Sequence, residues 1–225
     1  MDTGNSFSLL ELFRMGGLFM WPLLFFSIAV IAISLERAIY LGYHDLHMDD
    51  LGAALSTYIR EGKIAEGREY LGPLVKRRMG ARILLALIER AGTGERHMEQ
   101  AAETQALSCV NSLENGLNFL TPLGSISQLT GFLGTVSGMI GAFRSISLAT
   151  EVNAQIVANG IYEALITTEF GLVIAIIAMI SHSIFSHVID RFSTDVEQIC
   201  SGLIIEMTNP RQKDSGGEMR FNDDH

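Results

Sequence analysis

Cysteine and positive charge are both scarce in this chain, and each shortage weighs against a class of function. The 225 residues include two cysteines, Cys109 and Cys200. They lie far apart and lack a C-x-x-C or nearby histidine pattern, so they indicate no metal or redox site. Lysine and arginine number 16 against 25 acidic residues, for a net charge of -9. Binding to nucleic acid needs a basic surface, so nucleic acid is not an expected partner, and no cofactor is expected.

Patterns typical of catalysis are also missing. Residues such as His44, Asp45 and His47 show no spacing typical of a nucleophile with its base or of metal ligands. We therefore do not expect an enzyme. No internal repeat or broken helix pair is found, and such features are typical of secondary transporters, so a small transporter is also disfavoured.

Hydrophobic residues, by contrast, make up 48% of the chain and gather in three long segments. A hydrocarbon core of about 30 Å requires about 20 helical residues. The sequence therefore predicts an all-α membrane protein with three transmembrane helices, at residues 17–43, 119–143 and 161–189. The first segment is too long for a signal peptide and is expected to be retained.

The distribution of basic residues predicts the orientation, because lysine and arginine are retained on the cytoplasmic side. Nine of them lie in residues 44–118 and four after residue 189, whereas residues 1–16 and 144–160 hold one each. We expect the N-terminal segment and the 144–160 hairpin loop outside, and the 44–118 loop and the C-terminus in the cytoplasm.

The cytoplasmic parts show helical periodicity. Breaks at Gly62, Gly72-Pro73 and Gly92-Thr93-Gly94 predict short helices followed by a long one in residues 49–118. Two apolar stripes predict that the second and third membrane helices extend into a cytoplasmic bundle, the third through residues 190–208. The first stripe is Met98, Ala102, Ala106, Cys109, Leu113 and Leu117, and the second is Val188, Phe192, Val196, Ile199, Leu203 and Met207. Either the same subunit or a neighbouring copy has to cover these stripes. Residues 209–225 are polar and glycine-rich, and are expected to be disordered.

The second membrane segment carries small and polar residues in rows with a spacing of seven. The rows are Gly124, Gly131 and Gly138; Ser127, Gly134 and Gly141; and Thr121, Gln128 and Thr135. Small residues let helix backbones approach each other in lipid, so close packing is the simpler interpretation of the glycines. A packed interface needs no amide or hydroxyl, so Gln128 and Thr135 also fit a pore surface.

The third membrane segment carries Glu163 and Glu169. Carboxylates inside a membrane are costly and usually face a bundle interior or a water-filled path. Glu163 can also sit at headgroup level, because Asn159 and Gly160 resemble a helix start. A narrow face of this helix matches the glycine rows: Ala164, Thr168, Gly171, Ala175, Ala178 and His182. The depths of Thr135 and Thr168 predict that their hydroxyls meet at one level of the hairpin.

Two strings carry a resemblance to a known family. They are Gly131-Phe-Leu-Gly-Thr-Val-Ser-Gly-Met-Ile-Gly-Ala-Phe143 and Gly160-Ile-Tyr-Glu-Ala-Leu-Ile-Thr-Thr-Glu-Phe-Gly-Leu172. Together they resemble the signature of the MotA/TolQ/ExbB proton-channel family, and three spans rather than four favour its ExbB/TolQ branch. The first segment, with Trp21-Pro22 near its start, is similar too.

The resemblance implies a homo-oligomeric ring, a pentamer in this branch, around the helices of a single-span ExbD- or TolR-like partner, with a TonB- or TolA-like protein as a further candidate. It implies a proton pathway along Thr135, Thr168 and Glu163, to which Glu169 is a candidate addition. Two departures stand out: Ala175-Ile176-Ile177 lacks the proline often found there, and Glu169 replaces a small residue. The alternative function is a non-conducting scaffold that holds partner helices.

Overall fold

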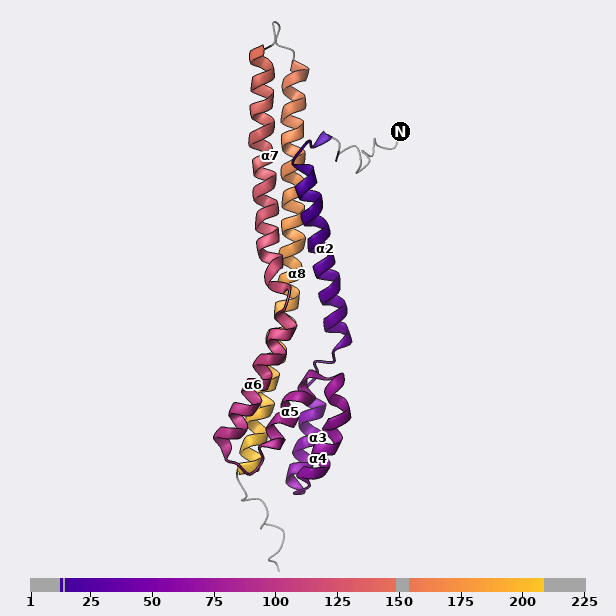
Figure 1. Cartoon of the computed structure of the whole chain (residues 1–225), viewed down its shortest axis with the longest axis vertical. Helices are drawn as coiled ribbons and strands as arrows, with labels where there is room; N and C mark the ends of the chain where they lie inside the picture. The colour runs from indigo at the N-terminus through magenta and orange to yellow at the C-terminus, as the bar shows by residue number, and fades with distance from the viewer. Residues whose placement is uncertain (1–12, 14, 149–153, 209–225) are drawn as a thin grey trace, which may run out of the picture. The chain divides into compact units, whose positions relative to one another are not determined.

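The computed structural model describes residues 13, 15–148 and 154–208, and all of its named elements are helices (Figure 1). The chain divides into two compact units. Unit 1 comprises Met1–Ile39 with Asn115–Ser186, and unit 2 comprises Tyr40–Glu114 with His187–His225.

Three long helices supply the membrane-spanning part. These are α2 (Met20–Tyr43), α7 (Leu120–Leu148, after the short η2, Leu117–Phe119) and α8 (Ala154–Thr208). Each is long and apolar enough to cross a membrane. The predicted all-α class with three membrane helices is therefore confirmed. Hydrocarbon provides no hydrogen-bond partners for the backbone. A helix is favoured here because its backbone N–H and C=O groups bond to one another within the segment.

The helices do not end where the apolar segments do. The α7 helix continues through Arg144 to Leu148, and α8 begins at Ala154, inside the region expected to form the hairpin loop. Hydropathy reports the apolar stretch, whereas the helical hydrogen-bond ladder continues through polar residues such as Ser145. At the other end of unit 1, α2 begins at Met20 because the chain turns at Gly17, which has a φ of 65°.

Unit 2 contains the short helices that the glycine breaks predicted. They are α3 (Asp49–Arg60), α4 (Ile64–Leu71), η1 (Gly72–Lys76), α5 (Met79–Glu89) and α6 (Glu95–Glu114). Gly62, Gly92 and Gly94 each have a positive φ, a conformation that glycine adopts without steric cost. The core of this unit is aliphatic, with fully buried Leu51, Leu55, Leu71, Ile83, Leu84 and Leu87.

The apolar stripes of α6 and α8 are largely covered within the chain. Met98, Ala102, Cys109 and Leu113 of α6 are buried, as are Phe192, Val196 and Leu203 of α8. The α3 helix supplies one cover for α8: a Cβ added at Gly52 would lie 2.7 Å from Cγ2 of Ile199. The Ser56 hydroxyl donates to Glu206 at 2.8 Å. Val188 is exposed, so the buried face differs slightly from the expected stripe.

An arginine links the segment after α2 to the start of α5 inside unit 2. The Arg78 guanidinium makes a two-pronged pair with Asp50, at 2.6 and 2.8 Å, and its Nε lies 3.0 Å from Asp45. It also donates to the backbone carbonyl of His47 at 3.0 Å. Bidentate arginine–carboxylate pairs are among the stronger polar contacts, so this cluster holds the connecting segment in place.

Candidate functional site: the α7–α8 hairpin

The α7 and α8 helices approach each other through glycine. A Cβ added at Gly131 would lie 2.9 Å from the carbonyl oxygen of Thr167, and one at Gly171 would lie 2.7 Å from that of Ser127. A Cβ at Gly138 would lie 3.1 Å from the carbonyl oxygen of Gly160. Real Cβ atoms do not fit at the Gly131 and Gly171 distances, and the Gly138 distance is tighter than most real Cβ contacts. The two backbones are therefore in direct contact along this row, as small residues permit in membranes.

Other members of the predicted faces lie in the same row. Gly124 faces Ala175 and Ala178, and Gly134 faces the Thr167 side chain. Ala164, Ala175 and Ala178 are all buried. Gly141 differs, because a Cβ there would meet nothing within 4 Å. Its position in a seven-residue row therefore does not place it in the helix contact.

The two predicted hydroxyls lie near one level but do not bond to each other. Thr168 donates across the interface to the carbonyl oxygen of Gly131 at 3.0 Å, whereas Thr135 donates within its own helix to Phe132 at 2.6 Å. Gly134 faces Thr167, so Thr135 lies within about one helical turn of Thr168 along the hairpin. Gln128 and Thr135 are half-buried. They lie seven residues apart and therefore occupy the same flank of α7.

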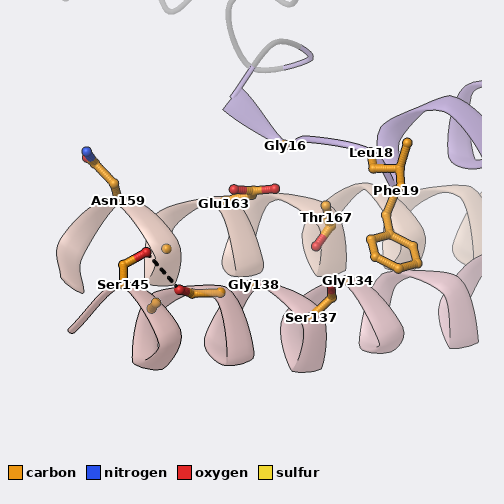
Figure 2. A pocket seen from close by; sticks show the side chains of 13 residues that line it. Gly16, Leu18, Phe19, Gly134, Ser137, Gly138, Ser145, Asn159, Glu163 and Thr167 are labelled. Carbon is orange, nitrogen blue, oxygen red and sulfur yellow. Dashed lines mark hydrogen bonds between the residues drawn. The ribbon is translucent and has the colours of Figure 1, made fainter. Parts of the chain in front are cut away.

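Glu163 lies on the other flank, in a pocket formed inside unit 1. The pocket has a volume of about 450 Å³ and is bordered by the Gly16–Phe19 turn, α7 and α8. Figure 2 shows Glu163 on the side of α8 that faces this turn, and Thr167 further along α8 with its side chain directed towards α7. Neither Thr135 nor Thr168 lines the pocket. The structure thus brings Glu163 together with Gly17 and Thr167, not with the two predicted hydroxyls.

Helical geometry explains this separation. Ser137 lines the pocket, and Thr135, two residues earlier, projects about 160° away from it around the α7 axis. Likewise Thr168, five residues after Glu163, projects about 140° away around the α8 axis. The hairpin therefore has two polar flanks, a pocket flank with Glu163 and a hydroxyl flank with Thr135.

Glu169 belongs to neither flank. Its side chain is exposed, as are those of Leu165 and Leu172 on the same face of α8. It points about 150° away from the row that meets α7. A carboxylate on an apolar, exposed helix face is costly in hydrocarbon, so this face needs water or another protein chain against it.

Two features of the site escaped the sequence reasoning. Thr167, rather than Thr168, is the fully buried hydroxyl of α8, at 1% exposure, and it donates to Ala164 at 2.9 Å. The Gly16–Gly17 turn lies against α8, where a Cβ added at Gly17 would overlap Oε1 of Glu163. The only available signal was the glycine pair itself, which precedes the first apolar segment.

The two cysteines lie outside the hairpin site. Cys109 and Cys200 are free and buried in unit 2. Burial raises the pKa of both thiols, that of Cys200 to about 12. Their thiolates are disfavoured at neutral pH, so both are expected to react slowly with thiol reagents.

Fold and site together define a polytopic helical membrane protein built on a glycine-packed hairpin. Residues 70–198 match the model of the MotA/TolQ/ExbB proton channel family. The chain belongs to this family. The three apolar helices and the family match support a multi-pass inner-membrane protein of a proton-channel family.

Individual relatives place it near the ExbB and TolQ members. The chain is 29% identical over 180 residues to biopolymer transport protein ExbB-like 1 of Synechocystis sp., covering 76% of this chain and 68% of the relative. It is 26% identical over 203 residues to an ExbB homolog of Methanothermobacter thermautotrophicus, covering 90% and 70%. The Tol-Pal system protein TolQ of Haemophilus influenzae is 40% identical over 86 residues, 38% of each chain.

Proposed function

We propose that this chain is the ring-forming channel subunit of an inner-membrane motor that converts proton motive force into mechanical work on a partner protein. The observation that carries the proposal is the hairpin itself. Its two helices touch through their backbones at Gly131 and Gly171, which leaves the half-buried hydroxyl flank of Thr135 beside the contact. A narrow, weakly polar wall suits the passage of protons.

In this proposal the channel chain supplies the wall and a partner supplies the moving element. The ring is a homo-oligomer, a pentamer as in the ExbB/TolQ branch, around a single-span protein of the ExbD or TolR type. A protein of the TonB or TolA type is the candidate receiver of the work. One charge that crosses 100 mV releases about 2.3 kcal/mol, so a few protons can drive a conformational cycle in the partner.

The residues have distinct proposed roles. Thr135 and Thr168 line the path and solvate the proton carrier, with Gln128 on the same flank as Thr135. Glu163 collects protons near the outer end of α8, and Glu169 is a further carboxylate for the path. The proposed orientation places the N-terminus outside and the C-terminus in the cytoplasm, because the basic residues gather in the 44–118 loop and the tail.

The test is proton uptake by liposomes that contain the chain and its single-span partner. Thr168→Val removes the hydroxyl without changing the side-chain shape, and we expect at least a tenfold loss of uptake. Glu163→Gln is expected to have the same effect. Thr130→Val controls for the loss of a threonine hydroxyl elsewhere in the hairpin, because Thr130 lies on α7 and donates within its own helix, to Ile126. Intact assembly with unchanged uptake in Thr168→Val and Glu163→Gln would refute the proposal.

One observation favours the alternative of a non-conducting scaffold. The Thr168 hydroxyl already serves the helix contact through its bond to Gly131, and exposed Glu169 is available to pair with a basic group of a partner. A scaffold predicts that Glu163→Gln combined with Thr135→Val still complements a deletion strain, whereas a channel predicts loss of the energised process.

A further inference from the structure

The pocket beside Glu163 is large enough to hold water. Its volume of about 450 Å³ compares with about 30 Å³ for each molecule in liquid water. Thirteen residues line it, among them the polar residues Ser137, Ser145, Asn159, Glu163 and Thr167. Apolar cavities stay dry, whereas a pocket with several polar partners retains water. The hydroxyls of Ser137 and Ser145, the amide of Asn159 and the Glu163 carboxylate supply such partners.

Glu163 is the one ionisable residue among those lining residues. Glu163 is half-buried, so the solvation of its carboxylate depends on what fills the pocket. A charged group at membrane depth usually faces a water-filled path. The other wall of the pocket is the Gly16–Phe19 turn of the same chain, as Figure 2 shows, so the pocket lies inside one subunit.

The Gly16–Phe19 turn lets the Glu163 carboxylate lie close to its backbone. Gly17 has a φ of 65°, a conformation that side chains rarely adopt. Any Cβ at this position would also overlap the Glu163 Oε1 atom. Gly16 is also closely surrounded, because a Cβ there would lie 2.5 Å from Cγ of Met20 and 3.3 Å from Cγ2 of Ile166. A side chain at position 17 would therefore strain the backbone and displace the Glu163 carboxylate from this approach.

Thr167 separates the pocket from the hydroxyl flank. Its side chain lines the pocket and packs on Gly134, while its hydroxyl is held by Ala164. The next residue, Thr168, donates to Gly131 across the interface. A proton that leaves Glu163 towards the hydroxyl flank therefore has to pass Thr167.

From this arrangement we infer that protons reach Glu163 through water in this pocket within a single subunit, and that Gly17 is a positioning residue for the Glu163 carboxyl. The inference rests on the proposed function and adds an entry route to it. The route lies on the opposite flank from Thr135, so entry and the hydroxyl-lined wall are separate parts of the path.

The first test measures water access without measuring proton flow. Ser137→Cys places a thiol in the pocket, and Phe132→Cys is the control, because Phe132 is exposed and projects about 140° away from Ser137 around the α7 axis. The native Cys109 and Cys200 are buried and contribute a low background. With a small charged methanethiosulfonate reagent on the assembled complex, we expect Ser137→Cys to react at least tenfold faster. Equal or slower reaction would overturn the pocket route.

The second test addresses the positioning role through proton uptake. We expect Gly17→Ala to reduce uptake at least tenfold and to move the midpoint of its pH profile. Gly62→Ala controls for backbone strain alone, because Gly62 has a φ of 72° but nothing within 4 Å of its Cβ position. Combining Gly17→Ala with Glu163→Asp, which is one methylene shorter, is expected to restore part of the uptake. A wild-type rate and pH profile in Gly17→Ala would overturn the role.

The two proposals fail in different ways. If Glu163→Gln blocks uptake while Ser137→Cys is as inert as Phe132→Cys, the pocket route is wrong and the proposed function stands. If Glu163→Gln conducts at the wild-type rate, the role of Glu163 is wrong in both proposals. The labelling result applies even if Gly17→Ala does not assemble, because it uses a different variant.

Discussion

The two units of this chain hold their helices together by opposite means. In unit 1 the α7 and α8 backbones touch at glycines, and large apolar side chains such as Leu129 and Ile140 point outward. In unit 2 the short helices bury leucine and isoleucine in a common core, and carry ion pairs at their surface. Lipid is as apolar as leucine, so burying leucine brings helices together in water but not in a membrane.

The largest effect is expected from a side chain added at the tightest backbone contact between α7 and α8. We expect Gly171→Val to separate α7 from α8, because even a Cβ would lie 2.7 Å from the Ser127 carbonyl oxygen. The expected result is loss of the folded, assembled complex, measured by size-exclusion chromatography and thermal melting in detergent. Gly202→Val, on the same helix with nothing within 4 Å, is the control. A normal complex from Gly171→Val would contradict the described contact.

A core substitution tests the aliphatic packing of unit 2 and has a smaller expected effect. Leu84 is fully buried, and Leu84→Ala leaves a cavity. Such substitutions cost about 2–5 kcal/mol, so we expect a lower melting temperature of unit 2 with the α7–α8 hairpin unaffected. Leu107→Ala, at a residue that is 57% exposed, serves as the control. Equal melting of the two variants would show that Leu84 is not in a packed core.

The ion pairs of unit 2 give the smallest effect and depend on pH. Hydrogen bonds from Arg78 hold the pKa of Asp50 below its ordinary value of 3.8, against the opposing effect of burial. A depressed pKa means that the pair stabilises the fold above pH 3.8 and that this contribution is lost as pH falls through the lowered pKa. We therefore expect the melting temperature of unit 2 to fall less in Asp50→Asn than in the wild type as the pH is lowered from about 5 to 2.

A neighbouring carboxylate provides the control for this effect. Asp49→Asn alters the adjacent residue, whereas the ion pairs of Arg78 go to Asp45 and Asp50. We expect Asp49→Asn to keep the wild-type pH dependence. Identical curves for the Asp49 and Asp50 variants would mean that the Arg78 pair does not contribute.

Much of the fold follows from periodicity and glycine spacing. The breaks at Gly62 and Gly92 were predictable because each interrupts a helical pattern, and both have a positive φ. The buried stripe of α6 followed from its spacing, because a helix that is apolar on one face has to bury that face. The glycine row of α7 indicated close packing, although Gly141 shows that a matching spacing does not guarantee contact.

The site was less predictable, because it depends on which side of each helix meets which neighbour. Periodicity placed Glu163, Thr135 and Thr168 in one hairpin, but the position of the Gly16–Phe19 turn divides them between two flanks. The roles of these residues in proton movement, and the pathway itself, stay predictions. Thr167 is the more buried of the two adjacent hydroxyls, although Thr168 also lies in the contact with α7.

Sequence alone determined that this chain forms three apolar helices joined to helical polar segments, because membrane thickness and backbone hydrogen bonding leave few other solutions. It also determined membership of a proton-channel family. Only the tertiary structure decided which groups share a space. The contact between Gly17 and Glu163 joins residues 146 positions apart in the chain, and no local periodicity encodes a contact of that separation.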